Sequence, residues 1–373
     1  MTRLVSALLW LTAAGQAQSP EIRGVWVDRV SLASREEIRA TMRTIAEANF
    51  NTVHLNVWSR GYPLWRSEVF RRETGIDVDP GFGGRDVLWE AIEEARAAGL
   101  AVVPWFEYGF VGGWSGYRPG QNGRGPIFDA HPEWLARTRS GEVRFPIAGG
   151  GGDHFWMAHT RPDVQEFLIS MVREVAAGYR VPAVEFDRAR YPQLDCGYDD
   201  YTRALYAETN QGAALPDNPA DPAFLRWRTE QLNAFLQRLH RGVKSADWRV
   251  LITNAPVPLP TSVSSFAQDY SAWIRQGSLD FVSPQVYRPN LASFERDLDN
   301  QIRALPPEAQ QRLVPGIDVT NGGVDELIAM IRAVRTRHLP GFVVWYYRGI
   351  SSTSWAKLRA TVAAERAPLP WRE

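Results

Sequence analysis

Carboxylates stand at the ends of several short apolar runs, where acid–base or nucleophilic chemistry could be placed. In the run from 184 to 192, Glu185 and Asp187 lie two positions apart. Because side chains alternate along a strand, residues at this spacing point to the same face. Their mutual repulsion raises one pKa unless Arg188 or Arg190 offsets it. Two carboxyls whose pKa values differ in this way can serve as a general acid and its ionised partner.

Glycoside hydrolysis is a reaction that such carboxyls perform. It needs two carboxyl groups that flank the bond, about 5 Å apart for retention or roughly 6.5–9.5 Å apart for inversion. We expect Asp187 to be the nucleophile or base and its partner to be Glu107 or Asp318. The aromatic setting of Glu107 could keep an acid protonated, whereas Asp318 could instead hold substrate hydroxyls or an arginine. The competing interpretation of Glu185 and Asp187 is a structural ion-pair cluster with the neighbouring arginines.

Polar and aromatic side chains near the other strand ends are candidates for substrate binding. Amides pair with sugar hydroxyls, and aromatic rings present flat apolar faces that stack on sugar rings. Two alternatives stay open, since the amides could be buried structural groups and the interior aromatics could simply fill the barrel. The candidate substrate-binding residues are Glu185, Arg188, Arg190, Tyr191, Trp58, Arg60, Tyr108, Asn254, Gln285, Tyr287 and Trp345.

Eight short apolar runs, each followed by an amphipathic helical pattern, must position these residues. Apolar strands that alternate with helices indicate a buried parallel sheet, and eight such units favour a closed (β/α)8 barrel of the α/β class. The predicted strands are Ile22–Asp28, Thr52–Trp58, Leu100–Glu107, Pro182–Asp187, Arg249–Asn254, Asp280–Tyr287, Leu313–Val319 and Gly341–Tyr347. The predicted helices are Arg35–Ala48, Arg85–Ala98, Pro162–Ala177, Ala223–Lys244, Phe266–Arg275, Leu291–Leu305, Val324–Arg337 and Ser354–Glu365.

Two connections are too long to be simple loops. Gly109–Thr160 follows the third predicted strand, and Arg188 to about Pro222 follows the fourth. Both leave the carboxyl ends of strands, where barrel enzymes place their active sites. We expect these two loops to wall a cleft for an extended ligand.

The composition narrows the choice of partner. Lysine plus arginine and aspartate plus glutamate number 42 each, which argues against nucleic acid because that partner usually demands a basic excess. Residues 1–17 are typical of a signal peptide, so we expect a single domain over 18–373 that is secreted or periplasmic. No membrane insertion is expected after cleavage. The single cysteine excludes an intramolecular disulfide, and the histidines lack metal-site spacing, so no metal or cofactor is predicted.

Several motifs together resemble the family-10 glycosyl-hydrolase-like proteins, in order and over nearly the whole mature chain. They are Arg23–Trp26, Asn49–Val53, Val57–Trp58 with Gly61–Tyr62, Trp105–Phe110, His131–Leu135, Arg161–Gln165, Glu185–Arg188 with Arg190–Pro192, Asp221–Phe224 with Trp227–Arg228, and Pro284–Arg288.

The resemblance implies more than the residues alone. The family is similar to bacterial envelope hydrolases, some of which cleave peptidoglycan glycan strands that lack stem peptides. It therefore implies a cell-envelope polysaccharide as substrate, with peptidoglycan glycan as the leading class. Where many relatives carry a second acid after the aspartate, this chain has Arg188. The alternatives are a catalytically silent barrel that grips glycan, and a metal-assisted deacetylase or esterase. The oligomeric state is left open.

Overall fold

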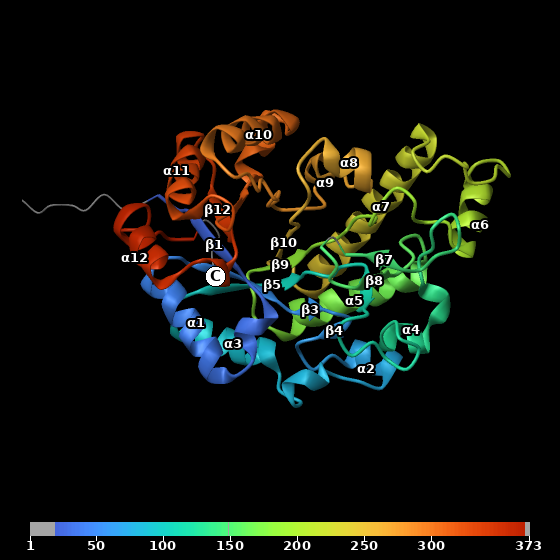
Figure 1. The fold of residues 1–373 in the computed structure, drawn as a ribbon, viewed down its shortest axis with the longest axis horizontal. Coiled ribbons are helices and arrows are strands. Elements are labelled where there is room, and N and C mark those ends of the chain that lie inside the picture. Colours follow the sequence, from blue (N-terminus) through green and yellow to red (C-terminus); the bar gives the residue numbers. More distant parts are fainter. Residues whose placement is uncertain (1–18, 148, 370–373) are drawn as a thin grey trace, which may run out of the picture.

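The computed structural model describes residues 19–147 and 149–369. The predicted signal peptide, residues 1–17, lies outside the described residues. Within them, one parallel sheet forms the centre of the molecule and helices surround it (Figure 1).

Seven strands make the central sheet, in the order β10-β9-β5-β2-β1-β12-β11, and every neighbouring pair is parallel. All are short and almost entirely buried, as expected for a sheet covered by helices. The strands are β1 (Ile22–Val27), β2 (Thr52–Asn56), β5 (Ala101–Phe106), β9 (Ala183–Phe186), β10 (Leu251–Thr253), β11 (Gly316–Asp318) and β12 (Gly341–Trp345).

The sixth predicted strand, Asp280–Tyr287, closes the barrel without forming a regular strand. On one side, the Asp280 and Ser283 amides donate to the Ile252 and Asn254 carbonyls, at 2.8 and 2.9 Å. On the other side, parallel bridges join Val282 to Leu313 and Gln285 to Gly316. Pro284 lies between these bridges and has no N–H to donate, which accounts for the interrupted ladder. The predicted (β/α)8 barrel is confirmed.

The eight predicted helices are all present. Local signals set their ends: the Ser34 side chain caps the first at the Glu37 amide, and Asp221 caps the fourth just before Pro222. Their observed bounds are α1 (Arg35–Glu47), α3 (Val87–Ala97), α5 (Pro162–Gly178), α7 (Pro222–Ala246), α9 (Tyr270–Arg275), α10 (Leu291–Ala304), α11 (Gly323–Thr336) and α12 (Ser352–Thr361). None of the helices within 19–147 and 149–369 is long and apolar enough to cross a membrane.

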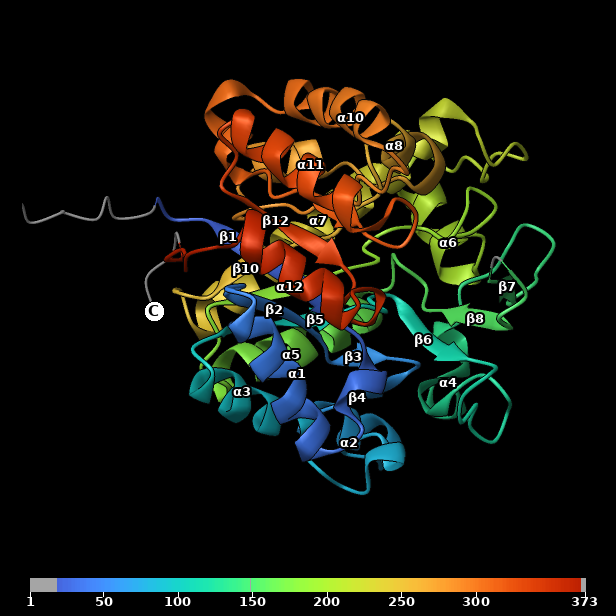
Figure 2. The same cartoon turned by 60° about the vertical axis from the view of Figure 1, so that its left-hand side comes forward.

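The two long connections carry secondary structure of their own. The first connection holds a small antiparallel sheet, in the order β6-β8-β7. The two connections lie together at one end of the barrel (Figure 2). A hairpin of β3 and β4 rises beside them after β2. The additional elements are β3 (Trp58–Ser59), β4 (Tyr62–Pro63), α2 (Glu68–Thr74), β6 (Val111–Trp114), α4 (Pro126–Ala130), β7 (Phe145–Pro146), β8 (Asp153–Trp156), α6 (Asp200–Thr209) and α8 (Thr261–Phe266), with short 3-10 turns at Arg29–Leu32, Pro80–Phe82, Pro132–Trp134, Pro307–Arg312 and Tyr347–Gly349.

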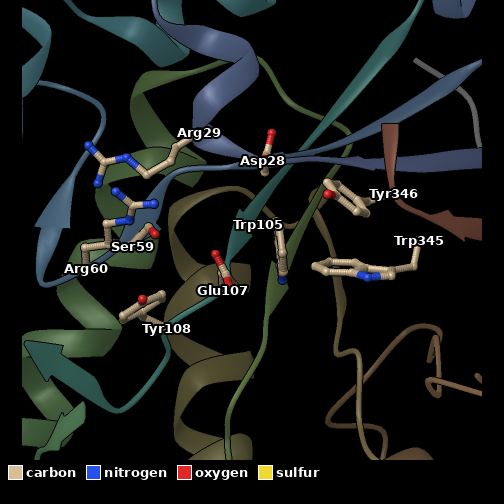
Figure 3. Close-up of a pocket in the computed structure, with 9 residues that line it drawn as sticks. All are labelled: Asp28, Arg29, Ser59, Arg60, Trp105, Glu107, Tyr108, Trp345 and Tyr346. Atoms are coloured by element: carbon tan, nitrogen blue, oxygen red, sulfur yellow. The ribbon is translucent and has the colours of Figure 1, made fainter. Parts of the chain in front are cut away.

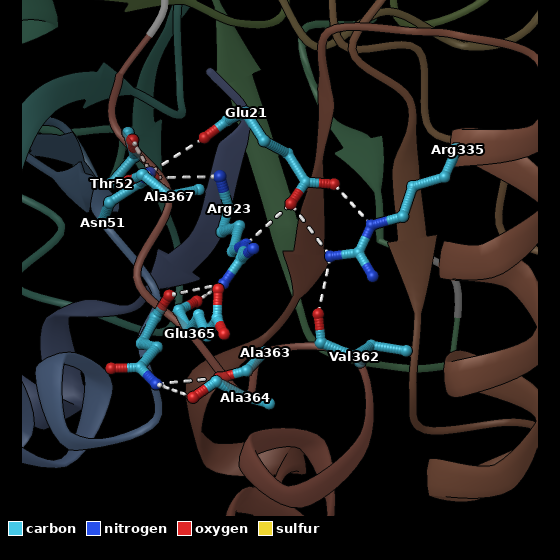
Figure 4. A network of polar contacts seen from close by, with 11 residues as sticks. Glu21, Arg23, Asn51, Thr52, Arg335, Val362, Ala363, Ala364, Glu365 and Ala367 are labelled. Atoms are coloured by element: carbon cyan, nitrogen blue, oxygen red, sulfur yellow. Dashed lines mark hydrogen bonds and ion pairs between the residues drawn. The ribbon is translucent and has the colours of Figure 1, made fainter. Parts of the chain in front are cut away.

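The opposite end of the barrel, where the strands begin, is closed by a polar network (Figure 4). The buried Arg23 guanidinium bonds Glu21 at 2.6 Å and the Glu365 carbonyl at 2.5 Å. Arg335 holds the other Glu21 oxygen at 2.7 Å, and the Asn51 amide reaches the Ala367 carbonyl at 3.1 Å. Burial alone would raise the pKa of Glu21, but hydrogen bonds from Arg335 and Arg23 hold it below the usual value. This basal network ties the C-terminal segment across β1 and β2.

Candidate active site

A pocket of ≈ 290 Å³ opens at the carboxyl ends of β1, β2, β5 and β12 (Figure 3). Arginines stand on one side of it and the rings of Trp345 and Tyr346 on the other, with Trp105 and Glu107 between them. The lining residues are Asp28, Arg29, Ser59, Arg60, Trp105, Glu107, Tyr108, Trp345 and Tyr346.

Glu107 follows directly after β5 and faces the pocket with about a fifth of its side chain exposed. The amide of Asn56, from the neighbouring strand, donates to one carboxylate oxygen. The Arg188 guanidinium lies 3.4 Å from the other oxygen and also donates to the Glu107 carbonyl at 3.0 Å. Glu107 is therefore an accessible carboxylate whose negative charge is balanced by one arginine.

Asp187 follows β9, the strand beside β5, and is only 3% exposed. One oxygen accepts a 3.3 Å hydrogen bond from the Trp105 indole and the other a 2.5 Å bond from the Arg188 amide. Burial raises the pKa of Asp187 to about 6, against the opposing charges of Arg188 and Arg190. Asp187 does not line the pocket, but it accepts a hydrogen bond from Trp105, which does.

Glu185 lies deeper in the barrel and is fully buried. Its oxygens accept hydrogen bonds from the Trp26 indole at 2.7 Å and pair with His54 Nδ1 at 3.0 Å. Both oxygens are thus engaged inside the barrel, which fits a positioning role for this side chain. Contact with substrate, as the sequence suggested, would require those partners to be displaced.

Asp318, the alternative partner carboxylate, is held by its own loop. One oxygen accepts the Thr320 amide and hydroxyl, both at 2.7 Å, and the other accepts the Asn321 amide. Asp318 is 4% exposed and does not line the pocket. Of the two possible partners for Asp187, the geometry favours Glu107.

The predicted substrate-binding residues differ in how deeply their side chains are buried. Arg60, Tyr108 and Trp345 line the pocket. The half-buried Tyr287 ring stacks on Trp345, with ring centroids 6.1 Å apart. Burial first, and then the charges of Asp187, Glu185 and Asp318, raise the pKa of Tyr287 well above its usual value.

Two further predicted residues are half-buried beside the site. Arg190 forms no ion pair within the described residues, and burial lowers its pKa to about 10. Its guanidinium lies 5.3 Å from the Phe266 ring. Gln285 donates to the Ala255 carbonyl at 2.9 Å.

Three of the predicted contacts do not fit their burial and are corrected here. Trp58 is fully buried, packs edge-on against Phe70 and donates its indole N–H to the Gly109 carbonyl at 3.0 Å. Tyr191 is 1% exposed and stacks on His159, with ring centroids 4.1 Å apart. Asn254 is fully buried and donates to the Phe186 carbonyl. These rings and this amide support the barrel, since no face of them is open to a ligand.

Sequence reasoning missed Arg29, Ser59 and Tyr346, which line the pocket. Each comes within one residue of a polar or aromatic residue at a strand end. Extending the search one residue into each loop would have found them. The Trp345–Tyr346 peptide bond, at this same point, is cis.

Histidines offer little to a metal here. Burial lowers the pKa of His154 to about 3, and His159 Nε2 is 2.9 Å from the Arg190 carbonyl. In the part of the chain that the structure describes, no three or more His, Cys, Asp or Glu side chains are grouped to hold a metal ion.

Comparison with known proteins agrees with this architecture. A family model described as Glycosyl hydrolase-like 10 matches residues 21–314. Glycosyl hydrolase DigH of Escherichia coli (strain K12) is 24% identical over 332 residues, which cover 77% of this chain and 66% of that protein. This chain thus spans slightly less than two thirds of the length of the curated relatives it matches.

Solved structures share the fold at low sequence identity. The PgaB (BpsB) glycoside hydrolase domain from Bordetella bronchiseptica aligns with a TM-score of 0.62 and 13% identity, over 92% of this chain and 99% of that one. The catalytic domain of β-amylase from Paenibacillus polymyxa aligns with a TM-score of 0.65 and 11% identity, over 94% and 100%. At these identities the likeness shows the fold alone, a barrel of the kind found in glycoside hydrolases.

Proposed function

Because the chain belongs to the glycosyl hydrolase-like 10 family, we propose that it is a glycoside hydrolase acting on a cell-envelope or extracellular polysaccharide. Peptidoglycan glycan strands are the leading substrate. The predicted export signal supports a secreted or periplasmic location, and the two long loops beside the pocket suit an extended polymer more than a small sugar.

The observation that carries this proposal is the contrast between Glu107 and Asp187 on neighbouring strands. Glu107 is exposed to the pocket and forms an ion pair with Arg188. Asp187 is buried, and its pKa of about 6 leaves about half of it protonated at pH 6 and roughly a tenth at pH 7. Two neighbouring carboxyls in environments this different divide the roles of acid and ionised partner.

The assignment of roles follows from that contrast. Asp187 gives its proton to the glycosidic oxygen as the bond breaks, and Glu107 stabilises the oxocarbenium-like carbon or activates the attacking group. The sequence suggested Asp187 as nucleophile or base and left open whether Glu107 or Asp318 is its partner, so this assignment gives Asp187 the other role. The change of role arises because Arg188 turns towards Glu107, while Asp187 has the more deeply buried side chain.

Aromatic rings beside the carboxyls give the sugar a platform. The Trp345 ring lies edge-on to Trp105, at 5.9 Å between centroids, and stacks with Tyr287. Trp345 is half-buried and lines the pocket, so it offers a flat surface to a pyranose ring.

A second candidate function is a catalytically silent barrel that binds glycan. The observation that favours it is the burial of Asp187, which is 3% exposed and separated from the pocket by Trp105. A general acid must come within hydrogen-bond distance of the oxygen it protonates.

Product analysis by mass spectrometry separates the two candidates. Purified protein is incubated with peptidoglycan glycan strands, either intact or stripped of peptides, alongside Asp187→Asn and Glu107→Gln. Shortened strands with wild-type protein, absent with both folded variants, establish the hydrolase. Co-sedimentation with the glycan but no shortening establishes the silent binder. If the protein neither cleaves nor binds the strands, peptidoglycan is excluded as its substrate.

A further inference from the structure

Two arginines gather at the end of the pocket farthest from Trp345. The head groups of Arg29 and Arg60 lie beside one another there, and both residues line the pocket (Figure 3). They come from different elements, the turn after β1 and the tip of the β3–β4 hairpin. Neither is among the residues that the proposed cleavage step uses.

The hairpin fixes Arg60 over the pocket. Arg60 and Gly61 both have positive φ, 58° and 82°, which makes a tight turn between the paired strands. Gly61 is needed there because a Cβ atom would come within 2.5 Å of the Gly112 carbonyl oxygen. The Arg60 guanidinium then lies 4.8 Å from the Trp114 ring centroid and 5.1 Å from that of Tyr117. Stacking on two rings holds the head group in place before any ligand arrives.

Arg29 is held by contacts with the same tyrosine and with Asp79. Its guanidinium lies 4.4 Å from the Tyr117 ring centroid, bonds the Tyr117 hydroxyl at 2.9 Å and pairs with buried Asp79 at 2.5 Å. The remaining terminal nitrogen, Nη1, is buried and has no hydrogen-bond partner in residues 19–147 and 149–369. An unused guanidinium donor in a buried position is costly unless a ligand or water completes it.

Arg60 is the arginine at this end of the pocket that has no ion-pair partner within the described residues. Asp79 is taken up by Arg29, and Glu107 by Arg188. Asp28, the other acid on the pocket wall, accepts the Ser31 hydroxyl at 2.9 Å. Neither Asp28 nor Arg60 forms an ion pair within the described residues, and the Arg60 head group lies beside that of Arg29.

We propose that the Arg29–Arg60 end of the pocket is a subsite for a carboxylate carried by one sugar unit of the substrate. This rests on the proposed function and specifies its substrate class, an acidic glycan in place of a neutral one. A guanidinium binds a carboxylate through two parallel hydrogen bonds, and a carboxylate supplies both an ion-pair partner for Arg60 and an acceptor for the free Arg29 donor. The carboxylate can belong to a uronic acid or to a lactyl ether on an amino sugar.

Binding is the direct test, measured by titration calorimetry on protein carrying Asp187→Asn so that no substrate is consumed. The ligands are peptide-free glycan oligomers with free lactyl carboxylates and oligoglucuronate, each beside its carboxyl-reduced form. We expect at least one acidic ligand to bind about tenfold or more tightly than its reduced form, as one charge-assisted contact predicts. The acidic ligand that binds identifies the source of the carboxylate.

Variants of Arg60 show whether this subsite causes the preference. Arg60→Gln should abolish the preference, Arg60→Lys should retain part of it, and Arg72→Gln, on a different surface, should leave it intact. Equal affinity for acidic and reduced ligands, equal weakening of both by Arg60→Gln, or no binding of any ligand would overturn the subsite. Because binding is read without turnover, the subsite can stand even if wild-type protein cleaves nothing, in which case only the proposed hydrolysis fails.

Discussion

The two ends of the barrel differ in whether their buried charges have partners. At the basal network, Glu21 is held by both Arg23 and Arg335, and backbone carbonyls of the C-terminal segment occupy further donors. At the pocket end, Asp187 is buried without a side-chain ion pair, and Arg29 Nη1 and Asn56 Oδ1 have no hydrogen-bond partner among the described residues.

The difference shows which end holds the fold together and which end is prepared for a ligand. A buried charge is tolerated when an opposite charge or a hydrogen bond compensates it. Removing one partner leaves the other charge buried and uncompensated, which lowers the free energy of unfolding. Unsatisfied groups cost stability in the free protein and recover it when a ligand completes them. We infer that the basal end contributes to stability and that the pocket end binds a ligand, as in other barrels of this type.

The largest expected effect comes from removing the Asp187 proton donor. Asp187→Asn should lower kcat/KM on the cleaved glycan by about 10²–10⁴-fold, the usual contribution of a general acid. Stability at neutral pH should be equal or higher, because an ionised buried carboxyl is removed. Steady-state kinetics and a urea titration of the same preparation measure both. A variant that loses stability along with activity would contradict the division between the two ends.

The reciprocal change at the basal end should affect stability alone. Arg23→Met removes one partner from Glu21 and leaves the Glu365 carbonyl without its donor, so we expect about 3 kcal/mol of destabilisation. Below the melting transition, kcat and KM should stay at wild-type values. Urea unfolding and kinetics at low temperature check this, with Arg72→Gln as a surface control. A changed KM would show that the basal end communicates with the pocket.

The pH dependence of stability should report Asp187. Its folded pKa, about 6, exceeds the ordinary value of 3.8, so between these pH values the unfolded chain binds fewer protons and stability falls as pH rises. The shift corresponds to about 3 kcal/mol, fully lost above pH 6. The difference in unfolding free energy between wild type and Asp187→Asn should change across pH 4–6 and be flat above it.

The pH dependence of activity should also reflect the ionisation of Asp187. If Asp187 is the acid, kcat/KM for wild type falls with an apparent pKa near 6 as its proton is lost. A fall in activity on the acidic side only would assign Asp187 to the base or nucleophile role instead.

The smallest effects should come from a matched pair of tryptophans. Trp58→Phe loses a buried hydrogen bond to Gly109 and some packing, about 1–3 kcal/mol of stability, with KM unchanged. Trp345→Phe, in the pocket, should raise KM about threefold to tenfold with little change in melting temperature. Thermal melts and kinetics on both variants measure this, and a raised KM for Trp58→Phe would restore it as a substrate contact.

The sequence was sufficient for the barrel, because strand and helix patterns depend on near neighbours in the chain. The run at 52–58 and the helix at 35–48 were placed within two residues of their observed ends. The run at 280–287 was also placed correctly, but Pro284 broke its ladder into isolated bridges. The alternation at Glu185 and Asp187 likewise predicted a shared face from spacing alone.

Depth and charge balance were decided only by the tertiary structure. Trp58 and Trp345 both come at the end of a predicted strand, yet only Trp345 lines the pocket. Trp58 is core, because it lies in the β3–β4 hairpin and packs against Phe70 and Phe167. Partners that fix the carboxyls are far away in the chain: Trp26 bonds Glu185 across 159 positions, and Trp105 bonds Asp187 across 82. Periodicity is written along the chain, whereas burial and the pKa values that follow from it depend on which distant residues the closed barrel brings together.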